Sequence, residues 1–207
     1  MTKRDTKNII LTTSLRLFSE KGYDGVGVRE IAKEIGIRES ALYKHYHNKQ
    51  AIFDSILNSI EERYSDAMTT FQLPEGFTKS LSNFNKEQQE LYSMCITMFQ
   101  FYLKDEYGSQ LRRLLTIEQY KNTAVGKIFR DAIINNGLEY ITNIFNKLID
   151  CKYYQDIDSS IMAIQFYSPL YLLLCKYDGL ENQYNEALSL LEKHIIQFDS
   201  MYRRKEG

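Results

Sequence analysis

Residues 28–46, VREIAKEIGIRESALYKHY, contain two short helical patterns separated by a glycine. In the first, Val28 to Ile35, apolar residues recur on one face, and Gly36 directly afterwards stops the helix. The second pattern runs from Glu39 to Tyr46. Two helices that pack at a steep angle need a small residue where they cross and a glycine at the turn, and Ala32 and Gly36 meet this need. The stretch predicts a helix-turn-helix motif, whose second helix enters the major groove of DNA.

Helical periodicity continues on both sides of this motif. Only two prolines occur in 207 residues and clusters of turn residues are rare, which disfavours strands joined by tight turns. The segment from Pro74 to Gly76 is the best candidate for a linker. Helices are predicted over about residues 5–21, 28–35, 39–46, 49–71, 86–104, 108–120, 123–149, 158–177 and 182–203. We therefore expect an all-α fold.

Charge is unevenly spread along the chain. Residues 1–50 hold 10 Lys and Arg against 6 Asp and Glu, a balance of +4. Residues 51–207 hold 16 against 21, a balance of −5. A small basic unit followed by an acidic body indicates that the amino-terminal part alone binds a polyanion.

The sequence also bears on the cellular compartment. Its three cysteines, Cys95, Cys151 and Cys175, are few, odd in number and far apart, which is typical of reduced thiols rather than of a disulfide framework. The charged start of the chain does not resemble a signal peptide, and no apolar run approaches the roughly 18 residues of a membrane span. We expect a cytoplasmic protein with no membrane partner.

Catalytic and metal-binding motifs find no support. His45 and His47 lie two residues apart, which places them on different faces of a helix, and no acidic or cysteine ligand lies at a suitable spacing nearby. The glycines of GYDGVG, residues 22–27, follow no strand and lack the third glycine of a dinucleotide-binding loop. Walker, HExxH and GxSxG sequences do not occur. We expect no metal, no cofactor and no enzymatic activity.

From Ile10 to Phe53 the sequence resembles the tetracycline-repressor (TetR) family of bacterial regulators. The resemblance is specific, because many elements fall in order at the family's spacing. These elements are Ile10-Leu11, Leu17-Phe18, Gly22-Tyr23, Val28-Arg29-Glu30-Ile31-Ala32, Gly36-Ile37, Leu42-Tyr43, His45-Tyr46, Lys49 and Ile52. The resemblance implies a helix-turn-helix DNA-binding domain over residues 1–48 and a helical ligand-binding and dimerisation domain over residues 49–207. The helix at about 49–71 would connect the two.

In the family, the start of the second helix, the recognition helix and a lysine that opens the fourth helix contact DNA. The resemblance places Val28 and Arg29 at the first of these positions. It places Tyr43 on one backbone phosphate and Lys49 on another, where the helix dipole favours an anion. His45 adds a phosphate or base-edge contact. The candidates for reading base edges lie on the exposed side of the recognition helix: Arg38, Glu39, Ser40 and Lys44. A Tyr43 that only fills the core and a Lys49 that is only solvated remain alternatives.

Some positions depart from the family pattern, and two of them stand at helix starts. Gly27 stands where a serine or threonine often caps the second helix, so the start of that helix is left with its backbone N–H groups. Arg38 stands where a capping serine is common, at the start of the recognition helix.

The resemblance further implies a homodimer formed through the helices at about 158–177 and 182–203. In the last helix, apolar residues recur at the 3.5-residue period of a helix packed along another helix: Tyr184, Leu188, Leu191, Ile195, Phe198 and Tyr202. The preceding helix, which contains Pro169, is apolar on more than one face. The alternative is that both helices pack only on their own body.

The family's body also binds a small-molecule effector. The segment at 86–104 is apolar nearly all round, which makes it the natural wall of such a pocket. The candidate ligand-binding residues are Tyr92, Met98, Phe99, Tyr102, Phe129, Tyr140 and Tyr167. Aromatic walls with a few hydroxyls suit a largely apolar or aromatic ligand. For any one of these residues, an ordinary place in the core is an equally good interpretation.

We expect a ligand-responsive, homodimeric transcriptional regulator that represses by occupying a palindromic operator in double-stranded DNA and is released by its effector. The alternative is a helical architectural or interaction protein that binds DNA through its basic unit without reading sequence. A protein of this second class would bind random and operator DNA equally well.

Overall fold

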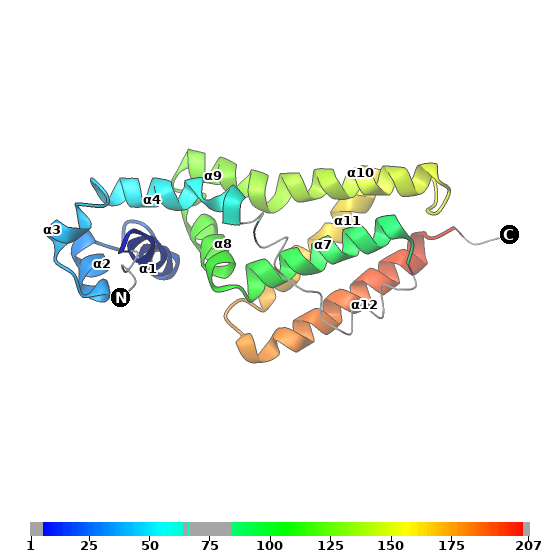
Figure 1. Cartoon of the computed structure of the whole chain (residues 1–207). Helices are drawn as coiled ribbons and strands as arrows, with labels where there is room; N and C mark the ends of the chain where they lie inside the picture. The colour runs from blue at the N-terminus through cyan, green and yellow to red at the C-terminus, as the bar shows by residue number, and fades with distance from the viewer. Residues whose placement is uncertain (1–5, 64–65, 67–83, 205–207) are drawn as a thin grey trace. The chain divides into compact units, whose positions relative to one another are not determined.

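The computed structural model describes residues 6–63, 66 and 84–204 (Figure 1). Their helices are α1 (Thr6–Lys21), α2 (Val28–Ile35), α3 (Glu39–Leu42), α4 (Lys49–Asn58), α7 (Lys86–Leu103), α8 (Glu106–Glu118), α9 (Thr123–Phe129), α10 (Asn136–Asp150), α11 (Ser159–Lys176) and α12 (Tyr184–Tyr202). A π-helical segment, Arg130–Asn135, precedes α10, and a 3₁₀ turn, Glu181–Gln183, precedes α12. The expected all-α fold is confirmed. Within the described ranges, no helix is long and apolar enough to cross a membrane.

The chain divides into two compact units. The first comprises Met1–Thr69 and Glu106–Phe129, and the second comprises Thr70–Asp105 and Arg130–Gly207. Helices α8 and α9 therefore pack with the amino-terminal helices rather than with the helices that flank them in sequence. The functional boundary between residues 48 and 49 stays a prediction, and the linker predicted at Pro74 to Gly76 lies outside the described residues.

In the first unit, α1 is the central helix and packs on α2, α4 and α8. Its buried residues Ile10, Leu15 and Phe18 form the core. The turn between α2 and α3 depends on Gly36, which ends α2 in the left-handed region at φ 76°. Only glycine adopts this conformation without strain, and the turn lets Ile37 N–H donate to the Ala32 carbonyl at 2.9 Å.

One predicted helix end in this unit is wrong, and a second predicted helix is interrupted. Helix α3 ends at Leu42 rather than at Tyr46, because the chain turns there and the N–H groups of His45 and Tyr46 both donate to the Leu42 carbonyl. Helix α4 begins at Lys49 as predicted but is interrupted at Ser59, whose hydroxyl donates to the Ile56 carbonyl at 2.8 Å. Residues 60–63 are helical again, and the predicted remainder up to 71 lies largely outside the described residues.

In the second unit, α10 packs along α11, and both contact α7 (Figure 1). The core is aromatic, with Phe145 stacked on Phe198 at 5.4 Å between ring centroids and Phe166 edge-on to Phe198 at 5.0 Å. Pro169 lies inside α11, which remains helical through it. Asp158 caps the start of this helix, because its carboxylate accepts the N–H groups of Ser160 and Ile161.

The helix predicted over 123–149 is helical throughout, but it contains a π-helical segment at Arg130–Asn135 that the sequence did not indicate. Inside this segment the Ile133 carbonyl accepts a hydrogen bond from the Tyr167 hydroxyl. One turn further on, Gly137 lies against the same ring, and a Cβ there would be 3.3 Å from Tyr167 Cε2. A π-helical segment widens one turn of a helix, so that a backbone carbonyl is free to accept a hydrogen bond from another partner.

Candidate functional site

The predicted DNA-binding residues lie on one stretch of the first unit, the start of α2, helix α3 and the start of α4. Gly27 precedes α2 in an extended conformation and, as the sequence indicates, gives the helix no side-chain cap. Arg38 likewise precedes α3 without a capping hydrogen bond. Backbone N–H groups at both helix starts are therefore not taken up by a capping side chain.

Helix α3 and the turn after it have a thin packed side and a wide exposed side. Leu42 is fully buried and Tyr46 is 6% exposed, so these two residues hold the segment on the unit. Tyr43 is 47% exposed, which excludes the alternative of a core aromatic. The other exposed predicted residues are Arg38, Ser40, Lys44 and His45.

Arg29 and Glu39 are joined across the turn. The Arg29 Nε atom donates to Glu39 Oε1 at 2.9 Å, and this hydrogen bond raises the pKa of Arg29. The Arg29 side chain is 90% exposed, so the pair is open to solvent and screened by salt. The Glu39 carboxylate is therefore already bound to an arginine, and Arg29 has further N–H groups left for another partner.

Ion pairs join α1 to α2 behind this surface. Lys21 Nζ donates to Glu30 at 2.5 Å and Arg16 donates to Glu34 at 2.5 Å. The hydrogen bond between Lys21 and Glu30 lowers the pKa of the Glu30 carboxyl and raises that of the lysine. All four side chains are solvent-accessible, so these pairs contribute to the orientation of α2 more than to stability.

Lys49, predicted to be on a phosphate, is bound within its own unit. Its ammonium donates to the carbonyl oxygens of Tyr23 and Val26, at 2.9 Å each, and lies 4.0 Å from the centre of the Tyr23 ring. An ammonium group has three N–H donors, so two of them hold the loop and one remains for a phosphate. The alternative of an idle, solvated Lys49 is thereby excluded, and a structural role is added that the sequence did not indicate.

The predicted ligand-binding residues are divided between the two units. Phe129 belongs to the first unit, whereas the other six belong to the second. Tyr140 is 37% exposed, and the Tyr167 hydroxyl is used by the Ile133 carbonyl. Met98, Phe99 and Tyr102 are buried on α7. The residues of α7 thus stay candidates for a pocket wall, and they serve equally as core.

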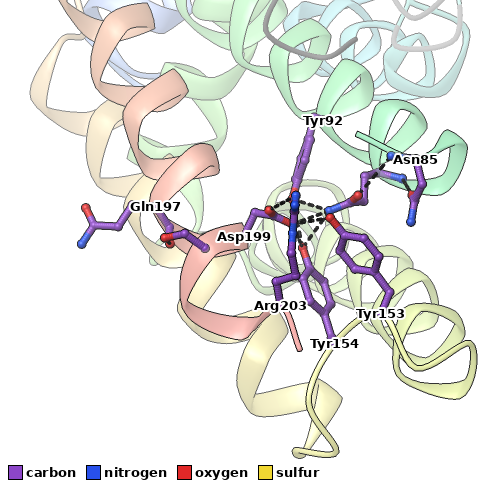
Figure 2. A network of polar contacts seen from close by, with 9 residues as sticks. Asn85, Tyr92, Tyr153, Tyr154, Gln197, Asp199 and Arg203 are labelled. Atoms are coloured by element: carbon purple, nitrogen blue, oxygen red, sulfur yellow. Dashed lines mark hydrogen bonds and ion pairs between the residues drawn. The ribbon is translucent and has the colours of Figure 1, made fainter. Parts of the chain in front are cut away.

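Tyr92 belongs to a buried polar network that the sequence did not predict (Figure 2). Its centre is Asp199, whose Oδ1 atom accepts from Gln88 Nε2 at 2.5 Å, from the Tyr154 hydroxyl at 3.1 Å and from the Tyr153 hydroxyl at 3.3 Å. Arg203 donates to Oδ2 at 2.6 Å, and the hydroxyls of Tyr92 and Tyr154 lie 3.0 Å apart. Burial raises the pKa of both of these tyrosines, so they remain protonated and act as donors.

This network joins distant parts of the second unit. Gln88 and Tyr92 come from α7, Tyr154 from the segment after α10, and Asp199 from α12. The signal in the sequence was an acidic residue four positions after Ile195, on the apolar side of the last helix. A carboxylate in that position must find donors, and here it finds four. Among the described residues, no group of three or more His, Cys, Asp and Glu side chains is placed to hold a metal ion.

Comparison with known proteins agrees with this geometry. Residues 10–56, which include α2, α3 and the start of α4, match the family model of bacterial regulatory proteins, tetR family. The similarity to the TetR family thus lies in the part of the chain that contains the helix-turn-helix. The chain is also similar to IcaR, the negative transcriptional regulator of the biofilm operon icaADBC of Staphylococcus epidermidis. The two are 45% identical over 47 residues, 23% of this chain and 25% of that protein.

The whole chain is similar in fold to solved regulators. The ketosteroid transcriptional regulator KstR2 of Mycobacterium tuberculosis superposes with a TM-score of 0.66 at 13% identity, over 99% of this chain and 98% of that one. A transcriptional regulator from Saccharomonospora viridis, solved in complex with choline, superposes with a TM-score of 0.68 at 15% identity, over 98% of this chain and 100% of that one. At these identities the likeness shows a shared fold.

Proposed function

We propose that the protein is a sequence-specific DNA-binding transcriptional regulator, and more specifically a repressor that acts in the cytoplasm. The observation that carries the proposal is the exposed face of α3 and its turn, fixed by Gly36 and by two buried anchors, in a domain of the TetR family. The negative regulator IcaR, to which this chain is similar over 47 residues, supports repression as the mode of action.

The roles of single residues follow from their exposure. Arg38, Ser40 and Lys44 are exposed and carry donors that reach base edges in the major groove. Tyr43 and His45 bind backbone phosphates, as does Lys49 through its third N–H group. Arg29 binds a phosphate near the start of α2, next to Val28, and Glu39 keeps it oriented.

We propose that the protein acts as a homodimer through α11 and α12. The predicted interface stripe of α12 supports this only in part, because its residues Leu191, Ile195 and Phe198 are buried in their own unit. The apolar residues that are free to meet a partner lie instead mainly on α11, where Ile161, Ile164 and Leu172 are exposed at helical spacing, with Ile196 on α12. A twofold dimer would present two α3 helices to the half-sites of a palindrome.

We propose further that a small, largely apolar or aromatic effector binds in the second unit and releases the protein from DNA. Two regulators of similar fold support the binding of a small molecule: one is named for ketosteroids and the other was solved with choline. The buried aromatic residues of α7 are the candidates for the wall. Polar contacts for the effector would come from the tyrosine hydroxyls of the same unit.

The test is DNA binding by the purified full-length protein, measured by fluorescence anisotropy on DNA from upstream of its own gene and on a shuffled sequence of the same length. We expect preference for the upstream DNA and an affinity that falls with salt. Equal affinity for both sequences would instead support the architectural alternative, and no binding at all would reject both. Native mass spectrometry of the same sample reports the dimer mass and any retained effector.

A further inference from the structure

The loop between α1 and α2, residues 22–27, is held from two sides. On one side its carbonyls at Tyr23 and Val26 accept the Lys49 ammonium of α4. On the other side the Tyr23 backbone N–H donates to Glu118 Oε1 of α8 at 2.9 Å. This loop leads directly into α2, so the two contacts fix the place where α2 begins.

Tyr23 is the residue on which these contacts meet. Its ring packs against Phe18 of α1 and Phe53 of α4, with centroids 5.5 and 4.7 Å away. Its hydroxyl donates to Gln50 Oε1 at 2.9 Å. The ring is thus anchored in the core, while the peptide groups on either side of it bind charged partners from α8 and α4.

Glu118 is unusual for a residue at the end of a helix, because it is only 3% exposed. Its carboxylate also lies 3.4 Å from the ammonium of Lys121, which solvent reaches. A hydrogen bond from a peptide N–H to a buried carboxylate is stronger than one between neutral groups. Space around the carboxylate is restricted as well, because a Cβ at Gly22 would lie 3.1 Å from Glu118 Oε1.

We propose that Glu118 is a positioning residue of the DNA interface, although it lies on α8 and belongs to none of the surfaces that meet DNA. It holds the 22–27 loop, and the loop in turn sets the start of α2 and the place of the Lys49 ammonium. DNA affinity is therefore controlled from α8, the helix that follows α7 of the second unit in the chain. This inference rests on the proposed DNA-binding function.

Two substitutions separate the hydrogen bond from the space that the side chain fills. Glu118→Gln keeps an oxygen that accepts from Tyr23 N–H, whereas Glu118→Met has a similar length and lacks a good acceptor. Glu106→Ala, at an exposed position on the same helix, is the matched control for loss of a negative charge. All variants are made in the full-length protein.

DNA affinity is measured by fluorescence anisotropy, and the Tyr23 amide is followed by its ¹⁵N–¹H signal and its hydrogen exchange. We expect Glu118→Met to weaken DNA binding by about tenfold or more, the change that corresponds to one lost charge-assisted hydrogen bond. Glu118→Gln should recover most of this affinity, and Glu106→Ala should bind like the wild type. Exchange of the Tyr23 amide should be slow in the wild type and in Glu118→Gln, and fast in Glu118→Met.

Different results refute different claims. A folded Glu118→Met protein that binds DNA like the wild type overturns the inference alone. Free hydrogen exchange of the Tyr23 amide in the folded wild type also overturns the inference. This measurement does not depend on whether the methionine variant folds. A wild-type protein without sequence-preferring DNA binding refutes the proposed function, and the DNA role of Glu118 with it.

Discussion

Replacing Asp199 with alanine should destabilise the second unit more than any single surface substitution. Its carboxylate is 3% exposed and accepts four hydrogen bonds (Figure 2). Two of the donors, Gln88 and Tyr154, are themselves buried and lose a charged acceptor. The Tyr154 hydroxyl retains Tyr92 as a partner, which limits the damage.

The magnitude follows from those two donors. A hydrogen bond to a charged group contributes about 1.5–3 kcal/mol, so two of them give about 3–6 kcal/mol. Because the contact between the tyrosines remains, we expect Asp199→Ala to lower the free energy of unfolding by about 3–5 kcal/mol. This is the size found when one partner of a buried charge pair is removed. In a chain of this length, each kcal/mol lowers the melting temperature by about 2–4 °C. The expected decrease is therefore roughly 6–20 °C.

Urea unfolding and calorimetry measure this loss, with two comparison variants. Asp199→Asn keeps one oxygen for the buried donors and should lose about 1–2 kcal/mol. Tyr153→Phe removes a single 3.3 Å hydrogen bond from a half-buried hydroxyl and should lose no more than about 1 kcal/mol. If Asp199→Ala loses less than about 1 kcal/mol, the network does not hold the unit together and the argument fails.

Three further predictions concern other parts of the chain. Lys49→Ala should weaken DNA binding on all sequences alike. It should also lower the free energy of unfolding by about 1–3 kcal/mol, because the loop carbonyls lose their donor. If urea unfolding gives Lys49→Ala the same free energy of unfolding as the exposed control Lys44→Ala, the intramolecular role is contradicted. Burial lowers the pKa of His194, so the unfolded chain binds a proton there more readily than the folded one. The free energy of unfolding should therefore keep its full value above the ordinary histidine pKa of about 6.5 and decrease at more acidic pH. His194→Gln keeps a donor for the Phe166 carbonyl, so it should show a smaller decrease between pH 7 and pH 5 in unfolding curves. Leu172→Lys, at a side chain that is 64% exposed, should change stability by less than about 0.5 kcal/mol but abolish the dimer mass in native mass spectrometry, and a retained dimer argues against α11 as the interface.

Local patterns in the sequence predicted the parts of the fold that local forces decide. Gly36 ends α2 because only glycine tolerates the backbone angle of that turn, and Val28–Ile35 forms a helix with the predicted bounds. The end of α3 was missed because Leu42 to Tyr46 has helical spacing, yet Asn48 caps the next helix by accepting the Ala51 N–H at 2.8 Å. The chain must turn before that cap, and this requirement outweighs the periodicity.

Contacts between segments far apart in the sequence could not be predicted in the same way. The periodic stripe of α12 correctly indicated a packed face, but a period of 3.5 residues does not say whether the partner is the same chain or another one. The structure places Leu191, Ile195 and Phe198 of that stripe in their own core. Lys49 shows the same limit, because a lysine at a helix start suits a phosphate and a pair of loop carbonyls equally well.

The charged residues of the first unit thus divide into two groups. Arg38 and Lys44 are exposed to solvent. Lys49 and Glu118 instead bind the peptide groups of one loop with their charged groups. A loop held by an anion at its N–H and by a cation at its carbonyls has little freedom to shift, because its peptide dipoles are oriented from both ends. In the proposed interface, specificity on α3 would therefore also depend on Lys49 and Glu118, since exposed side chains discriminate between sequences only when the backbone beneath them is fixed.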